Sequence, residues 1–190
     1  MFKKMMLLAG MALAVVAVAG PASASASWLN DHKAIEADET VTASGPAAFA
    51  IPGVAGASAK IHVNLEMTAG KTTGEITSFS ATECLGTGGF TGLTCTTEPR
   101  NLPWTVHITA ENTIEITDVE LHNEYYLGAH IPANTKATTI LVGDILATPD
   151  NAQTMSTLTL SNINATANGN AVTVTGDQTL SPAGTYGIEG

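Results

Sequence analysis

The sequence predicts an all-β fold: a single antiparallel β-sandwich or partly closed barrel of about eight to ten strands, after an N-terminal signal helix. Three observations support this prediction. Threonine, valine and isoleucine are abundant, and their branched side chains fit a pleated sheet better than a helix. Apolar and polar residues alternate strictly over several stretches. An Asn-Gly pair, Asn168-Gly169, is typical of a tight hairpin turn.

Residues 1–26 are typical of a secretory signal peptide. Lys3 and Lys4 supply the positive start, an apolar run covers residues 5–19, and Pro21–Ala26 offers the small residues of a cleavage site. The apolar run is short for a membrane anchor, and no second hydrophobic span follows it. We therefore expect an extracellular protein, secreted or associated with the cell surface, whose mature chain has no integral membrane span.

The chain is acidic. It carries 7 Lys and Arg side chains against 17 Asp and Glu, for a formal net charge of −10. Removal of Lys3 and Lys4 with the signal makes the mature chain more acidic still. Such a surface repels nucleic acid and anionic lipid, so we expect neither as a partner.

The mature chain opens with an irregular lead-in over residues 27–40, which show neither strand alternation nor a helical face. A single all-β domain is expected over residues 41–190. Pro46 cannot donate a ladder hydrogen bond, which predicts an edge position or a bulge. The clearest strand is 60–68, because its apolar residues alternate strictly with polar ones. Those residues are Ile61, Val63, Leu65 and Met67. The returning strand, 75–82, breaks this period and predicts a bulge near Thr77 or Ser78.

Residues 102–110 and 113–121 predict a hairpin. Trp104, Val106 and Ile108 share one face of its first strand, and the second strand changes register near Thr117-Asp118. A further strand is expected within 136–147. The strands 157–167 and 171–180 then meet at Asn168-Gly169-Asn170.

The only two cysteines, Cys84 and Cys95, enclose a loop rich in glycine and threonine. In an exported chain they predict a disulfide that closes this loop between two strands. By the loop-entropy argument, closing a ring of this size contributes roughly 3 kcal/mol. Phe90 at the loop tip, with Tyr125 and Tyr126, is the candidate recognition surface.

Other chemistry finds little support. The histidines (His32, His62, His107, His122 and His130) lack a metal-binding spacing, although His122 and Glu124 can share a strand face. Acids near turns (Asp118, Asp144, Asp150 and Asp177) do not form a dedicated calcium loop. No hydrolase motif is present. We expect no enzyme activity, no catalytic or metal-binding residues and no cofactor.

Cys84, Cys95, Leu102-Pro-Trp104 and the closing segment Thr179–Tyr186 resemble parts of small exported bacterial proteins. One such group comprises secreted domains of high-GC Gram-positive bacteria, and the other is the family of alkane oxidation activators. The resemblance covers roughly residues 40–186 in layout. It implies an extracellular or biofilm-matrix β protein rather than an enzyme, and it brings no site residues with it.

Three hypotheses of function follow. The first is a non-catalytic extracellular or surface-associated β domain that acts by contact with the matrix, the cell surface or its own copies. The second is a carrier that holds an apolar small molecule in an interior void lined by the 61–67 and 104–108 faces. The third is a secreted hydrolase with an unrecognised site, which requires His62, His107 or His122 to cluster with a serine or an acid.

Overall fold

The computed structural model describes residues 26–129 and 132–189, so residues 1–25 of the predicted signal peptide 1–26, with its predicted helix, and His130 lie outside the described residues. The regular structure in these ranges consists of strands and one 3-10 turn, which confirms the all-β class. None of the described residues belongs to a helix with the length and hydropathy needed to span a membrane. The elements are β1 (Ser27–Asn30), β2 (Lys33–Ala34), β3 (Glu39–Ile51), β4 (Ala55–Met67), β5 (Thr73–Gly88), β6 (Thr94–Arg100), β7 (Trp104–Ile108), β8 (Ile114–Tyr126), η1 (Pro132–Asn134), β9 (Thr135–Pro149), β10 (Thr157–Asn162), β11 (Thr166–Ala167), β12 (Asn170–Ala171), β13 (Thr173–Ser181) and β14 (Tyr186–Glu189).

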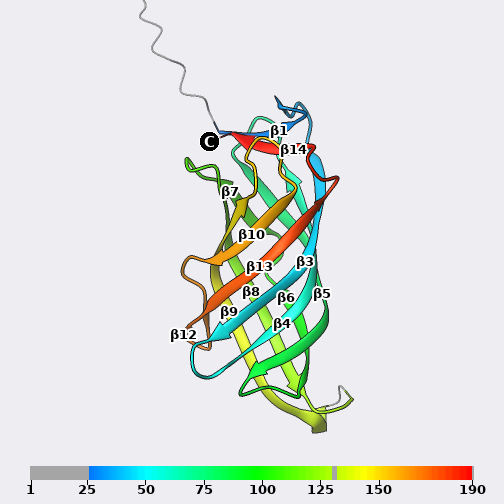
Figure 1. Ribbon diagram of the computed structural model, residues 1–190, viewed down its shortest axis with the longest axis vertical. Coiled ribbons are helices and arrows are strands. Elements are labelled where there is room, and N and C mark those ends of the chain that lie inside the picture. Colours follow the sequence, from blue (N-terminus) through cyan, green and yellow to red (C-terminus); the bar gives the residue numbers. More distant parts are fainter. Residues whose placement is uncertain (1–25, 130–131, 190) are drawn as a thin grey trace, which may run out of the picture.

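The long strands pair antiparallel in a closed circuit. From β3 the pairings run to β4 and β5, and then through β6 and β7, which both lie between β5 and β8. They continue through β9, β10 and β13 and return to β3. Figure 1 shows these strands wrapped around a common long axis. The sheet therefore closes on itself as in a barrel, whereas the sequence predicts a sandwich or a partly closed barrel.

Strand alternation decides which side chains enter the closed sheet. In β7, Trp104, Val106 and Ile108 are buried, as the sequence predicts. In β4, Leu65 and Met67 are buried while the residues between and beside them face outward or are half-buried. The interior is therefore built from one face of each strand.

The predicted irregularities are confirmed. The β4–β5 ladder shifts register where Asn64 pairs with Ser78 and Leu65 with Ile76, which places the bulge at Thr77. The β8–β9 ladder shifts between Ile116 and Val119, where Asp118 has a φ of 59°. The tight turn between β11 and β12 uses Asn168 and Gly169, both with positive φ.

Two predictions are corrected. Residues 27–40 contain β1 and β2 instead of an irregular lead-in, because β1 pairs with β14 from the far end of the chain, with Ser27 opposite Glu189. Pro46 is neither on an edge nor at a bulge, since β3 lies between β4 and β13 and both of its ladders keep the same register on either side of Pro46. The β13–β3 ladder skips Gly45 and Pro46, so the missing N–H of proline breaks no ladder bond.

The two ends of the closed sheet differ. At one end, the small-sheet end, the sheet of β14, β1 and β2 lies across the opening (Figure 1). Three large side chains are fully buried here: Trp28 and Ile188 of this sheet, and Met155 of the loop between β9 and β10. Trp28 Nε1 donates to the carbonyl of Thr73 at 2.8 Å. Gly74 admits the indole, because a Cβ there would lie 3.3 Å from Trp28 Cζ2 and clash with the carbonyl of Glu66. The opposite end, the loop end, carries the β3–β4 turn, the Cys84–Cys95 loop and η1.

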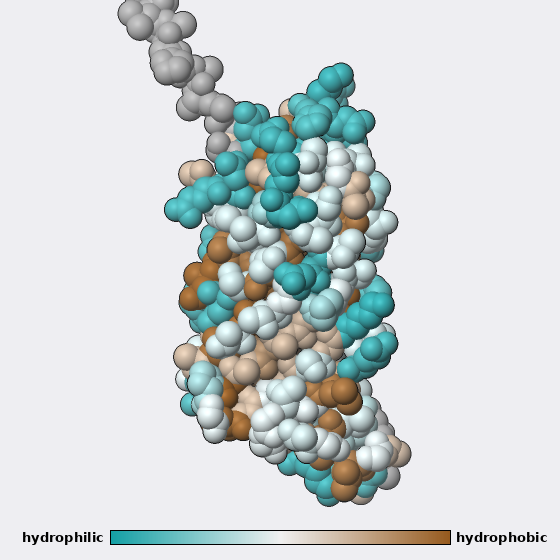
Figure 2. Space-filling model, viewed as in Figure 1, coloured by the Kyte–Doolittle hydropathy of each residue, from teal (hydrophilic) through white to brown (hydrophobic). Residues whose placement is uncertain are grey.

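The outer surface follows the same division. Figure 2 shows hydrophilic residues gathered at the small-sheet end, with more apolar surface over the strands below it. Large apolar side chains that remain exposed are Val54, Leu85, Leu127, Ile140, Val142 and Ile163.

Candidate functional site

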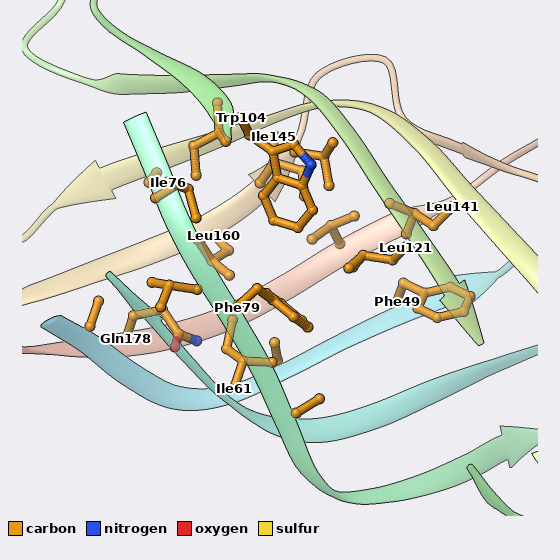
Figure 3. Close-up of a pocket in the computed structure, with 18 of the residues that line it drawn as sticks. Phe49, Ile61, Ile76, Phe79, Trp104, Leu121, Leu141, Ile145, Leu160 and Gln178 are labelled. Carbon is orange, nitrogen blue, oxygen red and sulfur yellow. The ribbon is translucent and has the colours of Figure 1, made fainter. Parts of the chain in front are cut away.

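A cavity of about 120 Å³ lies inside the closed sheet. Every strand of the closed circuit, from β3 to β10 and β13, contributes to its lining. Figure 3 shows the labelled side chains pointing into the space between the strands, with Trp104 and Ile145 on one side and Phe79 and Ile61 on another. By volume the cavity resembles engineered apolar cavities that bind benzene or xenon.

The cavity lies where several inward positions of three neighbouring strands are small. Alanine occupies these positions at Ala43 and Ala47 of β3, Ala57 and Ala59 of β4 and Ala81 of β5. Strands β8, β9 and β10 on the other side of the circuit contribute larger groups such as Leu121, Leu141 and Leu160. Short side chains facing long ones across a closed sheet of fixed diameter leave space between them.

The lining matches much of the interior that the sequence predicts for a carrier. The residues of the predicted faces that line the cavity are Ile61, Val63, Leu65, Trp104 and Val106. Met67 is fully buried but does not line the cavity, and neither does Ile108. The cavity thus ends short of the small sheet, where large side chains fill the interior.

Gln178 is a polar side chain on this apolar lining. It is 2% exposed, and its Nε2 donates to the carbonyl of Pro46 at 2.8 Å. Beside it, Gly45 lets the backbones of β3 and β13 approach closely, because a Cβ there would collide with the carbonyl of Asp177 and lie 3.2 Å from Gln178 Cα. Its Oε1 has no hydrogen-bond partner among the described residues.

Asn123 is a second polar side chain of the lining. It is also 2% exposed, and its Oδ1 accepts from Thr97 Oγ1 at 2.7 Å, while its Nδ2 has no partner among the described residues. None of the side chains that line the cavity is charged. The site is therefore an apolar chamber with two unsatisfied amides.

The loop end of the interior is closed by the predicted recognition residues. Cys84 and Cys95 form the predicted disulfide, with their Cα atoms 4.9 Å apart. The ring of Phe90 lies 4.3 Å from that of Tyr125, centroid to centroid. Tyr125 is fully buried, and burial raises its pKa while a hydrogen bond with Thr139 partly offsets the rise. Phe90 of the loop therefore packs on the buried Tyr125, and Tyr126 is half-buried at the end of β8.

The histidines do not converge. Within the described residues no three His, Cys, Asp or Glu side chains come close enough to hold a metal ion. His122 Nε2 lies 2.7 Å from Glu120 Oε1 on the outer side of β8. His32 and His62 are exposed and His107 is half-buried on a different strand.

The acids near turns accept hydrogen bonds from backbone N–H groups and from polar side chains. Asp144 Oδ1 accepts from the backbone N–H of Asp118 at 3.1 Å, and its Oδ2 accepts from Asn164 Nδ2 at 2.7 Å. Asp177 accepts from Thr159 Oγ1 at 2.8 Å. Asp150 Oδ1 accepts from the backbone N–H groups of Ser156 and Thr157, which lower the pKa of Asp150.

Sequence reasoning missed both amides of the cavity. Each lies in phase with apolar residues, Asn123 between Leu121 and Tyr125, and Gln178 two positions before Leu180. A polar side chain in the inward phase of a strand is the signal that reveals such a residue.

The chain was compared with models of protein families, with characterised proteins and with solved structures, and none of the three comparisons gave a match.

Proposed function

We propose that the protein is a non-catalytic carrier that binds a small apolar molecule inside its closed sheet. The observation that carries this proposal is the cavity of about 120 Å³ with an almost wholly apolar lining. Small-molecule sites are typically concave, largely apolar and furnished with a few placed polar groups. The cavity with Asn123 and Gln178 has each of these properties.

The free-energy cost of an empty cavity supports the proposal that a ligand occupies it. At about 24 cal/mol per Å³, an empty space of this size costs roughly 3 kcal/mol of folding free energy. That is a large share of the 5–15 kcal/mol that typically stabilises a domain. Larger side chains at the alanine positions of β3, β4 and β5 would remove the cost, and a bound ligand offsets it.

The setting of the proposed function is outside the cell. The signal-like segment 1–26 supports export, and the Cys84–Cys95 disulfide is consistent with an oxidising environment. Outside the cell a hydrophobic molecule is surrounded by water, and its transfer into an apolar chamber is favourable in proportion to the area that it buries.

The test is to fill the cavity. Ala43→Leu adds three carbons to an inward position of β3, and we expect it to abolish binding of n-hexane measured by titration calorimetry. Ala50→Leu is the matched control, because Ala50 lies on the same strand but faces outward. If the unaltered protein and both variants fail to bind hexane and similar small hydrocarbons, the carrier function is wrong.

A second candidate is action by contact with a surface or with other copies. Ile140 and Val142 are exposed on the outer face of β9, and Ile163 is exposed on the segment beside it, whose N–H donates to the carbonyl of Asp144. Exposed branched side chains favour association. The resemblance to matrix β proteins supports the same candidate.

Its test is a double variant, Ile140→Thr with Val142→Thr. We expect it to lower self-association in sedimentation and retention in the cell-surface fraction. Val54→Thr, at an exposed position of the β3–β4 turn, is the control. Unchanged sedimentation and retention would remove this candidate.

A further inference from the structure

The two unsatisfied amides specify the polar chemistry of the ligand. Asn123 Nδ2 and Gln178 Oε1 are both buried on the cavity lining and lack a hydrogen-bond partner among the described residues. Nearly all buried polar atoms in folded proteins are paired, because an unpaired one retains the full cost of leaving water. A bound molecule that pairs with them removes this cost, so the argument rests on the proposed carrier function.

The orientation of Gln178 is fixed by its neighbour. The carbonyl of Pro46 can only accept, so the nitrogen of the Gln178 amide must face it, as the 2.8 Å hydrogen bond shows. The oxygen Oε1 is then left for the cavity. It can only accept, so the ligand must present a donor there.

Asn123 requires the opposite group from the ligand, a hydrogen-bond acceptor. With Oδ1 accepting from Thr97 Oγ1 at 2.7 Å, the free Nδ2 needs an acceptor. A rotated amide would bond Thr97 through Nδ2 and leave the oxygen unpaired instead. A hydroxyl group satisfies Asn123 in both orientations, because it donates and accepts.

The two amides lie toward different ends of the cavity. In Figure 3 Gln178 is on the side of Ile76, whereas Leu121 and Leu141 lie on the opposite side near Phe49. Asn123 follows Leu121 by two residues on β8 and pairs with Thr139, two residues before Leu141. It therefore belongs to the end marked by the two leucines.

We propose that the ligand is an uncharged, mostly hydrocarbon molecule with a hydroxyl group that donates to Gln178 Oε1 and a second hydroxyl or carbonyl group that pairs with Asn123. The lining contains no charged side chain to compensate a buried ion. Carboxylates and ammonium groups are thus excluded, because a charge buried without a partner is far more costly than a neutral polar group.

The experiment uses four probes of equal chain length: n-hexane, 1-hexanol, 1,6-hexanediol and hexanoate. Each is titrated by calorimetry into the disulfide-bonded protein and into Gln178→Met, Asn123→Leu and the control Ala50→Leu, whose side chain faces outward on β3. We expect Gln178→Met to weaken 1-hexanol about tenfold, and either amide variant to weaken the diol about tenfold. Hexane affinity should not fall in the amide variants, because hexane makes no hydrogen bond that they remove, and hexanoate should bind at least a hundredfold more weakly than 1-hexanol.

The outcomes separate the inference from the function on which it rests. Hexane binding with equal alcohol affinities across all variants overturns the inference and leaves the carrier function standing, because water then satisfies the amides. Absence of binding for every probe overturns the carrier function itself. Hexanoate binding as tight as that of 1-hexanol overturns the neutral ligand. This last comparison uses only the unaltered protein, so it decides even if circular dichroism shows that an amide variant does not fold.

Discussion

The small-sheet end and the cavity are two regions of one closed sheet, and they differ in side-chain size rather than in backbone pattern. At the small-sheet end Trp28, Met155 and Ile188 are at most 1% exposed and fill the interior. Around the cavity several inward positions of β3, β4 and β5 carry alanine. Strand alternation therefore determines which side chains point inward, and the volumes of those side chains decide whether the interior is a packed core or a chamber.

The largest effect that this comparison predicts is at Trp28. Trp28→Ala removes a fully buried indole and its hydrogen bond to the carbonyl of Thr73. We expect a loss of about 3–5 kcal/mol in the free energy of unfolding, measured by urea denaturation. Leu160→Ala, on the cavity lining, should cost only about 2 kcal/mol, near the lower end for such changes, because its side chain already borders empty space. Equal losses at the two positions would contradict the division of the interior.

The loop end offers the next largest effect. Replacing Cys84 and Cys95 by serine removes the covalent closure of the loop whose Phe90 packs on Tyr125. We expect a loss of about 3 kcal/mol in unfolding free energy. The loosened end should also release a bound probe faster, which stopped-flow dilution measures. Ser80→Ala, at an exposed position of the same strand β5, is the control. If the variant has a lower unfolding free energy but the same rate of probe release, the ligand does not leave through the loop end.

Much of the local structure could be predicted from the sequence, because it depends on neighbouring residues. Alternation in 60–68 and 104–108, the bulge at Thr77, the register change at Asp118 and the Asn168-Gly169 turn each follow from a few adjacent side chains. The disulfide followed from the cysteine count in a chain with a signal-like start.

Closure and the cavity depend on contacts far apart in the chain. The pairing of β13 with β3 joins Leu180 to Ala43, and β1 finds its partner only in β14, so neither is visible in a local window. Alanine favours neither face of a strand by itself, and the vacant space beside it depends on the side chains across the sheet. Asn123 and Gln178 can be identified as interior residues only when the inward phase of their strands is known.

A matched pair on β3 sharpens the comparison at smaller scale. Val41 and Ala43 both point inward, but only Ala43 lines the cavity. Val41→Ile adds one methylene to a packed region and should cost about 1 kcal/mol, since overpacking forces neighbours to shift. Ala43→Leu adds more carbon yet should cost less, or stabilise, because it enters vacant space. Thermal unfolding of both variants checks the order, and the reverse order would mean that the space is not available to side chains.

The smallest predicted effect concerns the loop that holds Met155 in the small-sheet end. Asp150 Oδ1 accepts from the backbone N–H groups of Ser156 and Thr157, and these bonds lower the pKa of Asp150. A lowered pKa in the folded state means that the ionised carboxylate stabilises the fold at neutral pH. This contribution is present above the ordinary pKa of about 3.9 and is lost as the pH falls through the lower pKa of the folded state. Because the side chain is exposed, solvent screens its charge and the effect is small.

Asp150→Ala should therefore lower the unfolding free energy at pH 7 by about 1 kcal/mol, as for a lost side-chain acceptor at a helix cap. Asp150→Asn keeps an acceptor without the charge, so it should lose less at pH 7 and lack the decline below pH 4 that we expect this carboxylate to cause in the unaltered protein. Urea denaturation of the three proteins between pH 3 and pH 7 measures the difference. The same decline in Asp150→Asn would assign the acid sensitivity to other carboxylates, and the support of Met155 would then depend on the loop backbone rather than on the charge of Asp150.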